Sequence, residues 1–113
     1  MQDVPSCIYD VKYIFPILNR VDAFGEVKAS DLEALGIGWK TVDSRLKMLM
    51  ELDIVETHVR VRGRRIRMYS LTEKGRKLYQ LMCLGRRLVN GECSIEDGRI
   101  IELLEEPPEI DGD

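Results

Sequence analysis

The chain has 113 residues, which is room for one domain, and its hydrophobic fraction of 44% excludes wholesale disorder. No apolar run approaches the ~20 residues that a membrane span needs. The first residues show no basic segment followed by an apolar one, so we expect neither a secretory signal nor a membrane association. A cytoplasmic protein is the expectation that follows.

The net charge of −3 conceals an uneven distribution of charge along the chain. Residues 1–91 contain 16 of the 17 basic and 11 of the 20 acidic residues, which gives a net charge of +5. Residues 92–113 contain Arg99 and nine acidic residues, which gives −8. Such an asymmetry separates a basic body from an acidic tail and points to an anionic partner for the body.

The first predicted element is a helix. Apolar residues recur at steps of one, three and four from Cys7 to Phe24, which places them on one helical stripe. Ser6 is the expected N-cap, and Gly25 is expected to end the segment. Pro16 lies inside the pattern, and because proline removes a backbone donor we predict a kink there or a break into two pieces.

Two shorter helices are predicted next. Ser30 and Glu33 have the spacing of a capping box, which predicts a short helix that stops at Gly36. A third helix is expected from about Trp39 to Leu52. Its inward stripe consists of Val42, Leu46 and Leu49.

The second half of the chain predicts a β-hairpin and two further helices. Ile54–Val61 alternates poorly at first and then clearly from Val59, and Ile66–Leu71 alternates again, which predicts two strands joined by a loop near residues 62–65. Thr72 is expected to cap a long helix that continues to about Asn90. We expect one more helix over about Asp97–Glu105, followed by an unstructured end.

Four segments in this order carry a resemblance to a known family. They are Ala29–Ile37, Thr41–Leu49, Leu52–Val55 and Tyr69–Gly75. Together they resemble the winged helix-turn-helix domains of the MarR, ArsR and PadR classes of regulators, over about residues 13–82. The resemblance implies a mainly α fold with a small β-hairpin (α+β), with additional N- and C-terminal helices. Together with the elements predicted on either side, it gives two expected regions: residues 6–91 form a winged helix-turn-helix domain with a long fourth helix, and residues 92–113 form an acidic C-terminal helix and disordered tail.

The third helix of such a domain enters the major groove of DNA. If Val42, Leu46 and Leu49 face inward, the opposite side carries residues that suit base edges and phosphates. The predicted contacts on this helix are Trp39, Lys40, Thr41, Asp43, Ser44 and Lys47. A solvated helix face is the alternative for these residues. For Trp39, packing on the second helix is the favoured alternative to stacking on a sugar or a thymine methyl group.

The hairpin strengthens the prediction of nucleic-acid binding. Five arginines occupy eight positions with no acidic residue among them, namely Arg60, Arg62, Arg64, Arg65 and Arg67. Such crowding is tolerated when a polyanion neutralises it and counterions are released. An arginine at a hairpin tip also suits an A·T-rich minor groove. The alternative is protection of a strand edge against pairing, for which one or two charges suffice.

No catalytic set or metal site is visible. His58 is the one histidine, and no glycine-rich phosphate loop is present. We therefore predict no enzymatic activity, no metal and no cofactor. Cys7, Cys83 and Cys93 are interpreted as free thiols, with a thiolate cluster or redox switch as the alternative.

The sequence favours a sequence-specific DNA-binding transcriptional regulator, with repression as the expected action and double-stranded DNA as the partner. Two apolar seams on the helix over residues 73–90 predict a homodimer, because only one of them can cover the domain's own core. A winged-helix protein–protein interaction module and a non-specific architectural DNA-binding protein are the alternatives.

Overall fold

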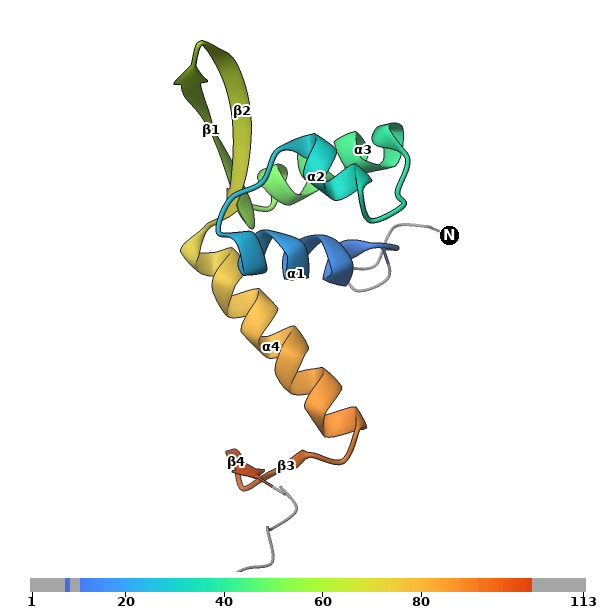
Figure 1. Cartoon of the computed structure of the whole chain (residues 1–113). Coiled ribbons are helices and arrows are strands. Elements are labelled where there is room, and N and C mark those ends of the chain that lie inside the picture. The colour runs from blue at the N-terminus through green and yellow to red at the C-terminus, as the bar shows by residue number, and fades with distance from the viewer. Residues whose placement is uncertain (1–7, 9–10, 103–113) are drawn as a thin grey trace, which may run out of the picture. The chain divides into compact units, whose positions relative to one another are not determined.

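The computed structural model describes residue 8 and residues 11–102. The chain forms two compact units, residues 1–79 and residues 80–113. In chain order, the first unit contains α1 (Ile14–Phe24), α2 (Ala29–Glu33), α3 (Trp39–Glu51), β1 (Val55–Arg62), β2 (Arg64–Leu71) and the start of α4 (Glu73–Val89). The rest of α4 belongs to the second unit, together with β3 (Cys93–Glu96) and β4 (Arg99–Glu102) (Figure 1). The predicted α+β class with one small hairpin after three helices is confirmed.

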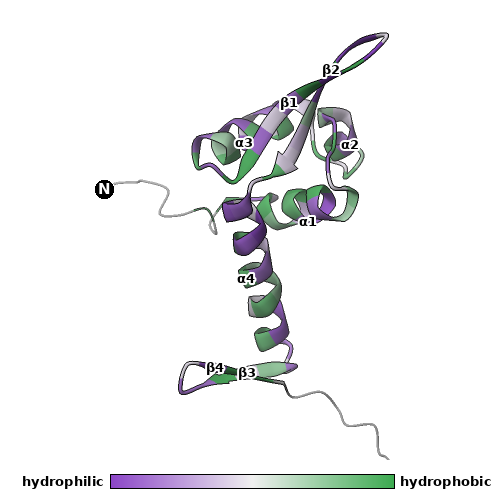
Figure 2. Ribbon diagram, turned by 90° about the vertical axis from the view of Figure 1, so that its left-hand side faces the viewer, coloured by the Kyte–Doolittle hydropathy of each residue, from purple (hydrophilic) through white to green (hydrophobic). Residues whose placement is uncertain are grey.

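The core of the first unit lies between its three helices and the base of the β1–β2 hairpin. Its buried side chains are Ile14, Ile17, Leu18 and Val21 of α1, Leu32 of α2, Val42, Leu46 and Leu49 of α3, Val55, Tyr69 and Leu71 of the hairpin, and Val27, Ile37 and Ile54 of the connecting segments. The far end of the hairpin is largely hydrophilic (Figure 2). The hairpin is therefore anchored by apolar burial at its base only.

The first helix is shorter than the sequence predicts. It begins at Ile14, so Pro16 lies in its first turn, where the backbone N–H groups have no partner within the helix. Proline therefore costs little there, and the predicted break into two pieces at Pro16 is wrong, because one helix runs from Ile14 to Phe24. Tyr13 precedes the helix in the left-handed region with φ 74°. Ser6 and Cys7 lie outside the described residues.

The capping box predicted for the second helix is wrong by two residues. The N-cap is Lys28, whose backbone N–H donates to a carboxylate oxygen of Asp31 at 2.9 Å. Ser30 and Glu33 lie within the helix instead. Asp31 replaces the expected Glu33 because it stands three residues after the true N-cap, which is the spacing that the reciprocal bond requires. The turn at Gly36 is confirmed, with φ 88°.

The third helix, its turn and the hairpin follow the prediction closely. Val42, Leu46 and Leu49 are buried. Asp53 adopts the left-handed conformation with φ 62°, and the next residue enters the core. The hairpin is tighter than expected, because Arg62 pairs directly with Arg64 and only Gly63, at φ 78°, lies between the strands.

The start of α4 is fixed against the segment that precedes β1. The hydroxyl of Thr72 accepts a hydrogen bond from the backbone N–H of Gly75 at 2.9 Å, which confirms the predicted cap. The backbone N–H of Thr72 donates to the carbonyl of Ile54 at 3.0 Å. Gly75 is buried against the same carbonyl.

The helix predicted over residues 97–105 is wrong for its described part. Residues 93–102 form a second antiparallel hairpin, in which Ile95 pairs with Ile100 and Glu96 with Arg99. Asp97 and Gly98 make its two-residue turn, both with positive φ (53° and 77°), the combination that Asp-Gly favours in type I′ turns. Residues 103–105 lie outside the described residues.

Within the described ranges, no helix is long and apolar enough to cross a bilayer.

Candidate nucleic-acid interface

The outer side of α3 is a polar, accessible surface. Because Val42, Leu46 and Leu49 point into the core, the residues between them face solvent. Lys40, Asp43, Ser44 and Lys47 are all exposed, and Thr41 is half-buried. Lys47 and Asp43 form an ion pair one turn apart, with 3.1 Å between Nζ and Oδ2. Lys40, Asp43, Ser44 and Lys47 therefore share one face, although Asp43 partly neutralises Lys47.

Trp39 is largely exposed. Its exposed fraction is 63%. The Nζ atom of Lys40 lies 5.9 Å from the centre of the indole ring. Trp39 therefore presents most of its apolar surface to solvent at the first turn of α3.

The arginines of the β1–β2 hairpin lie on both of its faces. Residues that pair directly across two antiparallel strands project to the same face, and successive residues alternate. Arg60, Arg62 and Arg64 therefore share one face. Arg65 and Arg67 share the other, with Val59 and Val61. This second face is continuous with the buried face at the base, where Val55 and Tyr69 enter the core.

One of the five arginines is neutralised within the fold. The Nε atom of Arg60 donates to Oε2 of Glu26 at 2.7 Å, and Nε2 of His58 lies 2.8 Å from Oε1 of the same carboxylate. The hydrogen bond from Arg60, followed by the one from His58, lowers the pKa of Glu26 below its ordinary value. The other four arginines of the hairpin form no ion pair with any residue that the structure describes.

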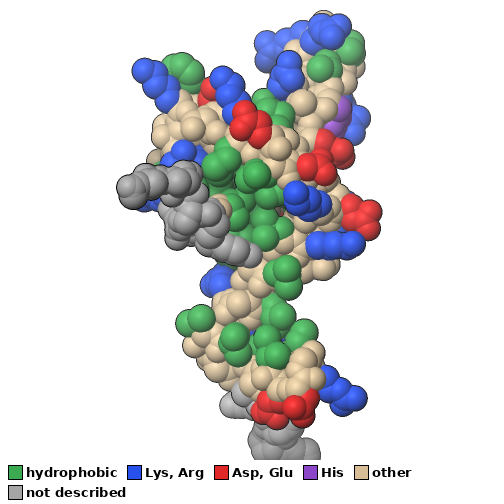
Figure 3. All heavy atoms as spheres, turned by 180° about the vertical axis from the view of Figure 1, so that it is seen from behind, with side chains coloured by type: hydrophobic (Ala, Val, Ile, Leu, Met, Phe, Trp, Pro, Cys, Tyr) green, Lys and Arg blue, Asp and Glu red, His purple; other side chains and the backbone are tan. Residues whose placement is uncertain are grey.

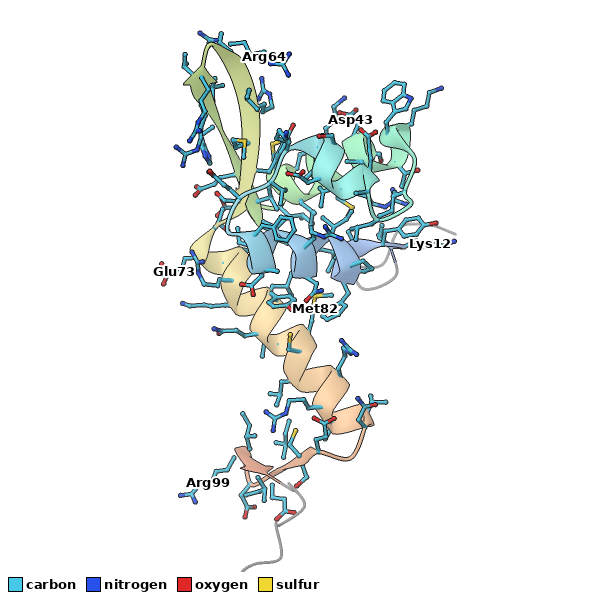
Figure 4. The ribbon with its side chains drawn as sticks, in the orientation of Figure 1. Lys12, Asp43, Arg64, Glu73, Met82 and Arg99 are labelled. Carbon is cyan, nitrogen blue, oxygen red and sulfur yellow. The ribbon has the colours of Figure 1, made fainter. Side chains whose placement is uncertain are left out.

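The hairpin and the outer side of α3 point in the same direction. Figure 4 shows Asp43 on the side of α3 from which the hairpin extends, with Arg64 at the hairpin tip. Lys and Arg side chains gather at the far end of the hairpin (Figure 3). The two predicted contact elements therefore form one rim of the first unit, with a helix face beside a projecting basic ribbon (Figure 1).

Three basic residues elsewhere in the first unit have structural partners. The Nε atom of Arg45 donates to the carbonyl of Lys12 at 2.8 Å, and Nζ of Lys74 donates to the carbonyl of Leu52 at 2.8 Å. Lys77 lies 3.7 Å from Glu73 in an i,i+4 pair. The sequence does not predict the contacts of Arg45, or those of Glu26 with the wing. Each of these two side chains binds a residue more than thirty positions away along the chain.

The described residues contain no group of three or more His, Cys, Asp and Glu side chains that could hold a metal ion. His58 contacts Glu26 rather than a nucleophile. Cys83 and Cys93 are free thiols, and Cys7 lies outside the described residues.

Comparison with solved structures identifies the fold. The reduced form of the transcriptional regulator YodB from B. subtilis aligns with a TM-score of 0.61 and 26% identity, covering 74% of this chain and 83% of that one. The chain has the winged helix-turn-helix fold of this regulator. In this fold β1–β2 is the wing, and α3 is the second helix of the helix-turn-helix.

Two further structures share the winged helix. The HTH-type transcriptional regulator ytcD aligns with a TM-score of 0.57 and 24% identity, covering 71% of this chain and 87% of that one. Diamide-treated YodB aligns with a TM-score of 0.56 and 23% identity, covering 80% and 99%. No family model and no curated protein sequence matches the chain.

Proposed function

We propose that this winged-helix chain is a sequence-specific DNA-binding transcriptional regulator that acts as a repressor. The recognition helix α3 would lie in the major groove, and the wing would contact the minor groove and the sugar–phosphate backbone. The structurally similar YodB and ytcD are transcriptional regulators, which supports this general class.

The observation that carries the proposal is the distribution of charge on the wing. Arg62 and Arg64 lie on one face of the two-stranded ribbon, Arg65 and Arg67 on the other, and none has an anionic partner among the described residues. A minor groove is about 6 Å wide and has a phosphate strand on each side. A thin ribbon with cations on both faces suits contact with both strands, whereas protection of a strand edge needs only one or two charges.

The exposed face of α3 supports direct reading of sequence. Lys40 suits guanine or phosphate, Ser44 suits several base edges, and Asp43 accepts from a cytosine amino group. All three are exposed, and Figure 4 shows Asp43 on the side of α3 from which the wing extends. A protein bound across a promoter through these elements blocks access to the same DNA, so repression needs no additional catalytic surface.

We also propose that the active form is a homodimer joined through the second unit. Large apolar side chains are exposed there, with exposed fractions of 60% at Leu81 and 85% at Val89. Leu88 on α4 and Ile95, Ile100 and Ile101 of the β3–β4 hairpin are exposed as well. A two-fold dimer would present two recognition helices to half-sites about 34 Å apart. Sedimentation at tens of micromolar should give twice the monomer mass for the wild type and for Gln80→Asp, a change of charge at another exposed position of α4. A monomeric Val89→Asp variant supports the second unit as the interface, and a monomeric wild type excludes the dimer.

The decisive test of DNA binding is selection of bound sites from random duplexes, followed by a salt titration on the selected site. Neutralising about five to seven phosphates predicts a log–log slope of roughly −4 to −6, and specific binding should be at least ~10³-fold tighter than binding to random duplex. No binding at low salt would favour a protein-interaction module. Equal binding to all duplexes would favour an architectural protein.

Matched variants separate the two contact elements. Replacing Arg64 and Arg65 with alanine should weaken binding to every duplex and reduce the magnitude of the salt slope by about 2. Arg99→Ala removes an exposed arginine from the second hairpin and serves as the control. Ser44→Ala or Lys47→Ala should change the selected sequence instead. If the Arg64 and Arg65 double variant binds like the wild type, the wing does not contact DNA.

A further inference from the structure

The wing is attached to the helices by a second device besides its buried base. The segment between α1 and α2 runs beside β2, where Val27 and Tyr69 exchange two backbone hydrogen bonds of 2.9 and 2.8 Å. Val27 is fully buried. Neighbouring residues of an extended segment project to opposite sides. Glu26 therefore lies on the face of the wing that carries Arg60, Arg62 and Arg64.

From this position the Glu26 carboxylate reaches β1. One oxygen contacts Nε2 of His58 and the other accepts from Nε of Arg60, at 2.8 and 2.7 Å. His58 and Arg60 are two residues apart and so share a face. Both carboxylate oxygens are therefore engaged by β1, and the linker, β2 and β1 are held together.

This contact lies beyond the last buried residues of the wing. The core reaches Val55 on β1 and Tyr69 on β2, and no residue of 58–68 is buried. Glu26 holds residues 58–68 from outside the hairpin, through its contacts with His58 and Arg60. Among the described residues, no other hydrogen bond or ion pair joins residues 58–68 to a residue outside the hairpin. Without them the outer wing would be free to swing about its apolar base.

We propose that Glu26 is a positioning residue of the DNA interface, which fixes the angle of the wing relative to α3 through His58 and Arg60. Arg60 then belongs to this attachment rather than to the phosphate contacts. This inference rests on the proposed DNA-binding function and refines its contact set to the arginines at positions 62, 64, 65 and 67. Holding the wing in its bound position before DNA arrives removes an ordering cost from association.

The sign of one substitution distinguishes this role from simple electrostatics. Removing a negative charge near a polyanion should tighten binding if charge alone matters. Glu26→Gln keeps the size of the side chain but loses the ion pair, and we expect it to weaken binding by about threefold to tenfold because the wing is no longer pre-positioned. Glu56→Gln is the matched control, since Glu56 is exposed on the same face of the wing and forms no ion pair with a described residue. It should bind as tightly as the wild type or slightly more tightly.

The salt dependence tests the role of Arg60. Arg60→Ala should weaken binding about as much as Glu26→Gln and leave the salt slope unchanged, and the double variant should be no weaker than either single one. Arg62→Ala should instead reduce the magnitude of the slope by about 1. Amide exchange over residues 58–68, measured without DNA, should be faster in Glu26→Gln than in Glu56→Gln.

The outcomes separate this inference from the proposed function. If the wild type binds its selected site but Glu26→Gln binds equally well or better, Glu26 does not position the wing and only this inference fails. A smaller salt slope for Arg60→Ala would show that Arg60 contacts a phosphate, and again only this inference fails. A wild type that binds no duplex overturns both.

Discussion

A single methyl group at Gly75 should destabilise the first unit strongly. A Cβ atom at this position would lie 2.0 Å from the carbonyl oxygen of Ile54, 2.9 Å from its carbonyl carbon and 3.1 Å from its Cγ2. Two of these three atoms belong to the backbone, so no change of rotamer relieves the clash. The same carbonyl accepts the backbone N–H of Thr72, so moving it also disturbs the start of α4.

The size of the effect follows from two opposing terms. Overpacking costs about 1–3 kcal/mol, and a contact with backbone places Gly75→Ala near 3 kcal/mol. Alanine is favoured over glycine within a helix by about 1 kcal/mol, which leaves a net loss of about 2 kcal/mol. For a domain of this size, that loss corresponds to a decrease in Tm of roughly 8–15 °C.

Thermal unfolding followed by circular dichroism measures the difference, with Gly85→Ala as the control. Gly85 also lies in α4, but a Cβ atom there would meet nothing within 4 Å. Gly85→Ala should therefore gain up to about 1 kcal/mol from helix propensity alone. A Gly75→Ala protein as stable as Gly85→Ala would show that α4 does not start against Ile54 as described.

Three further predictions concern the turn, the indole and the carboxylate. Asp53→Ala should lose about 1 kcal/mol of stability while Asp53→Gly loses none, because φ is 62° and only glycine escapes the left-handed penalty entirely. Urea unfolding compares the two variants, and equal losses of stability would contradict this prediction. If Trp39 contacts a thymine methyl group, replacing thymine with uracil in the selected site should weaken DNA binding by the wild type about fourfold per buried methyl and leave binding by Trp39→Ala unaffected. Equal sensitivity of both proteins would show that the indole does not contact a thymine methyl group. The pKa of Glu26 is lower in the fold than its ordinary value of 4.5, so its ion pair stabilises the fold above pH 4.5 and is lost as the pH falls through the folded pKa. The stability difference between wild type and Glu26→Gln should therefore vanish in acid. A difference that persists in acid would contradict the stabilising role of this ion pair.

The elements with a strong local pattern could be predicted from the sequence. The stripe on α3, the left-handed turn at Asp53 and the Thr72 cap each depend on residues within a few positions of one another. The second hairpin is not predicted although Asp97-Gly98 is a strong turn signal, because the apolar residues from Ile100 onward also fit a helical stripe. A short apolar run fits either period.

The site was predictable in its residue types but not in its pairing. The basic wing and the polar face of α3 could be listed from the sequence, whereas their exposure and shared direction required the fold. The link from Glu26 to Arg60 spans 34 positions and appears in no local pattern. It removes one arginine from a set that the sequence presents as equivalent.

The division of the wing arginines between two faces has a consequence for the rate of association. Guanidinium groups on opposite sides of a ribbon repel each other less than they would in one cluster, so the wing can be folded in free solution. Encounter with a duplex then needs no prior rearrangement, and long-range attraction guides it. Added salt should accordingly slow the arrival of the protein at DNA more than it hastens its departure.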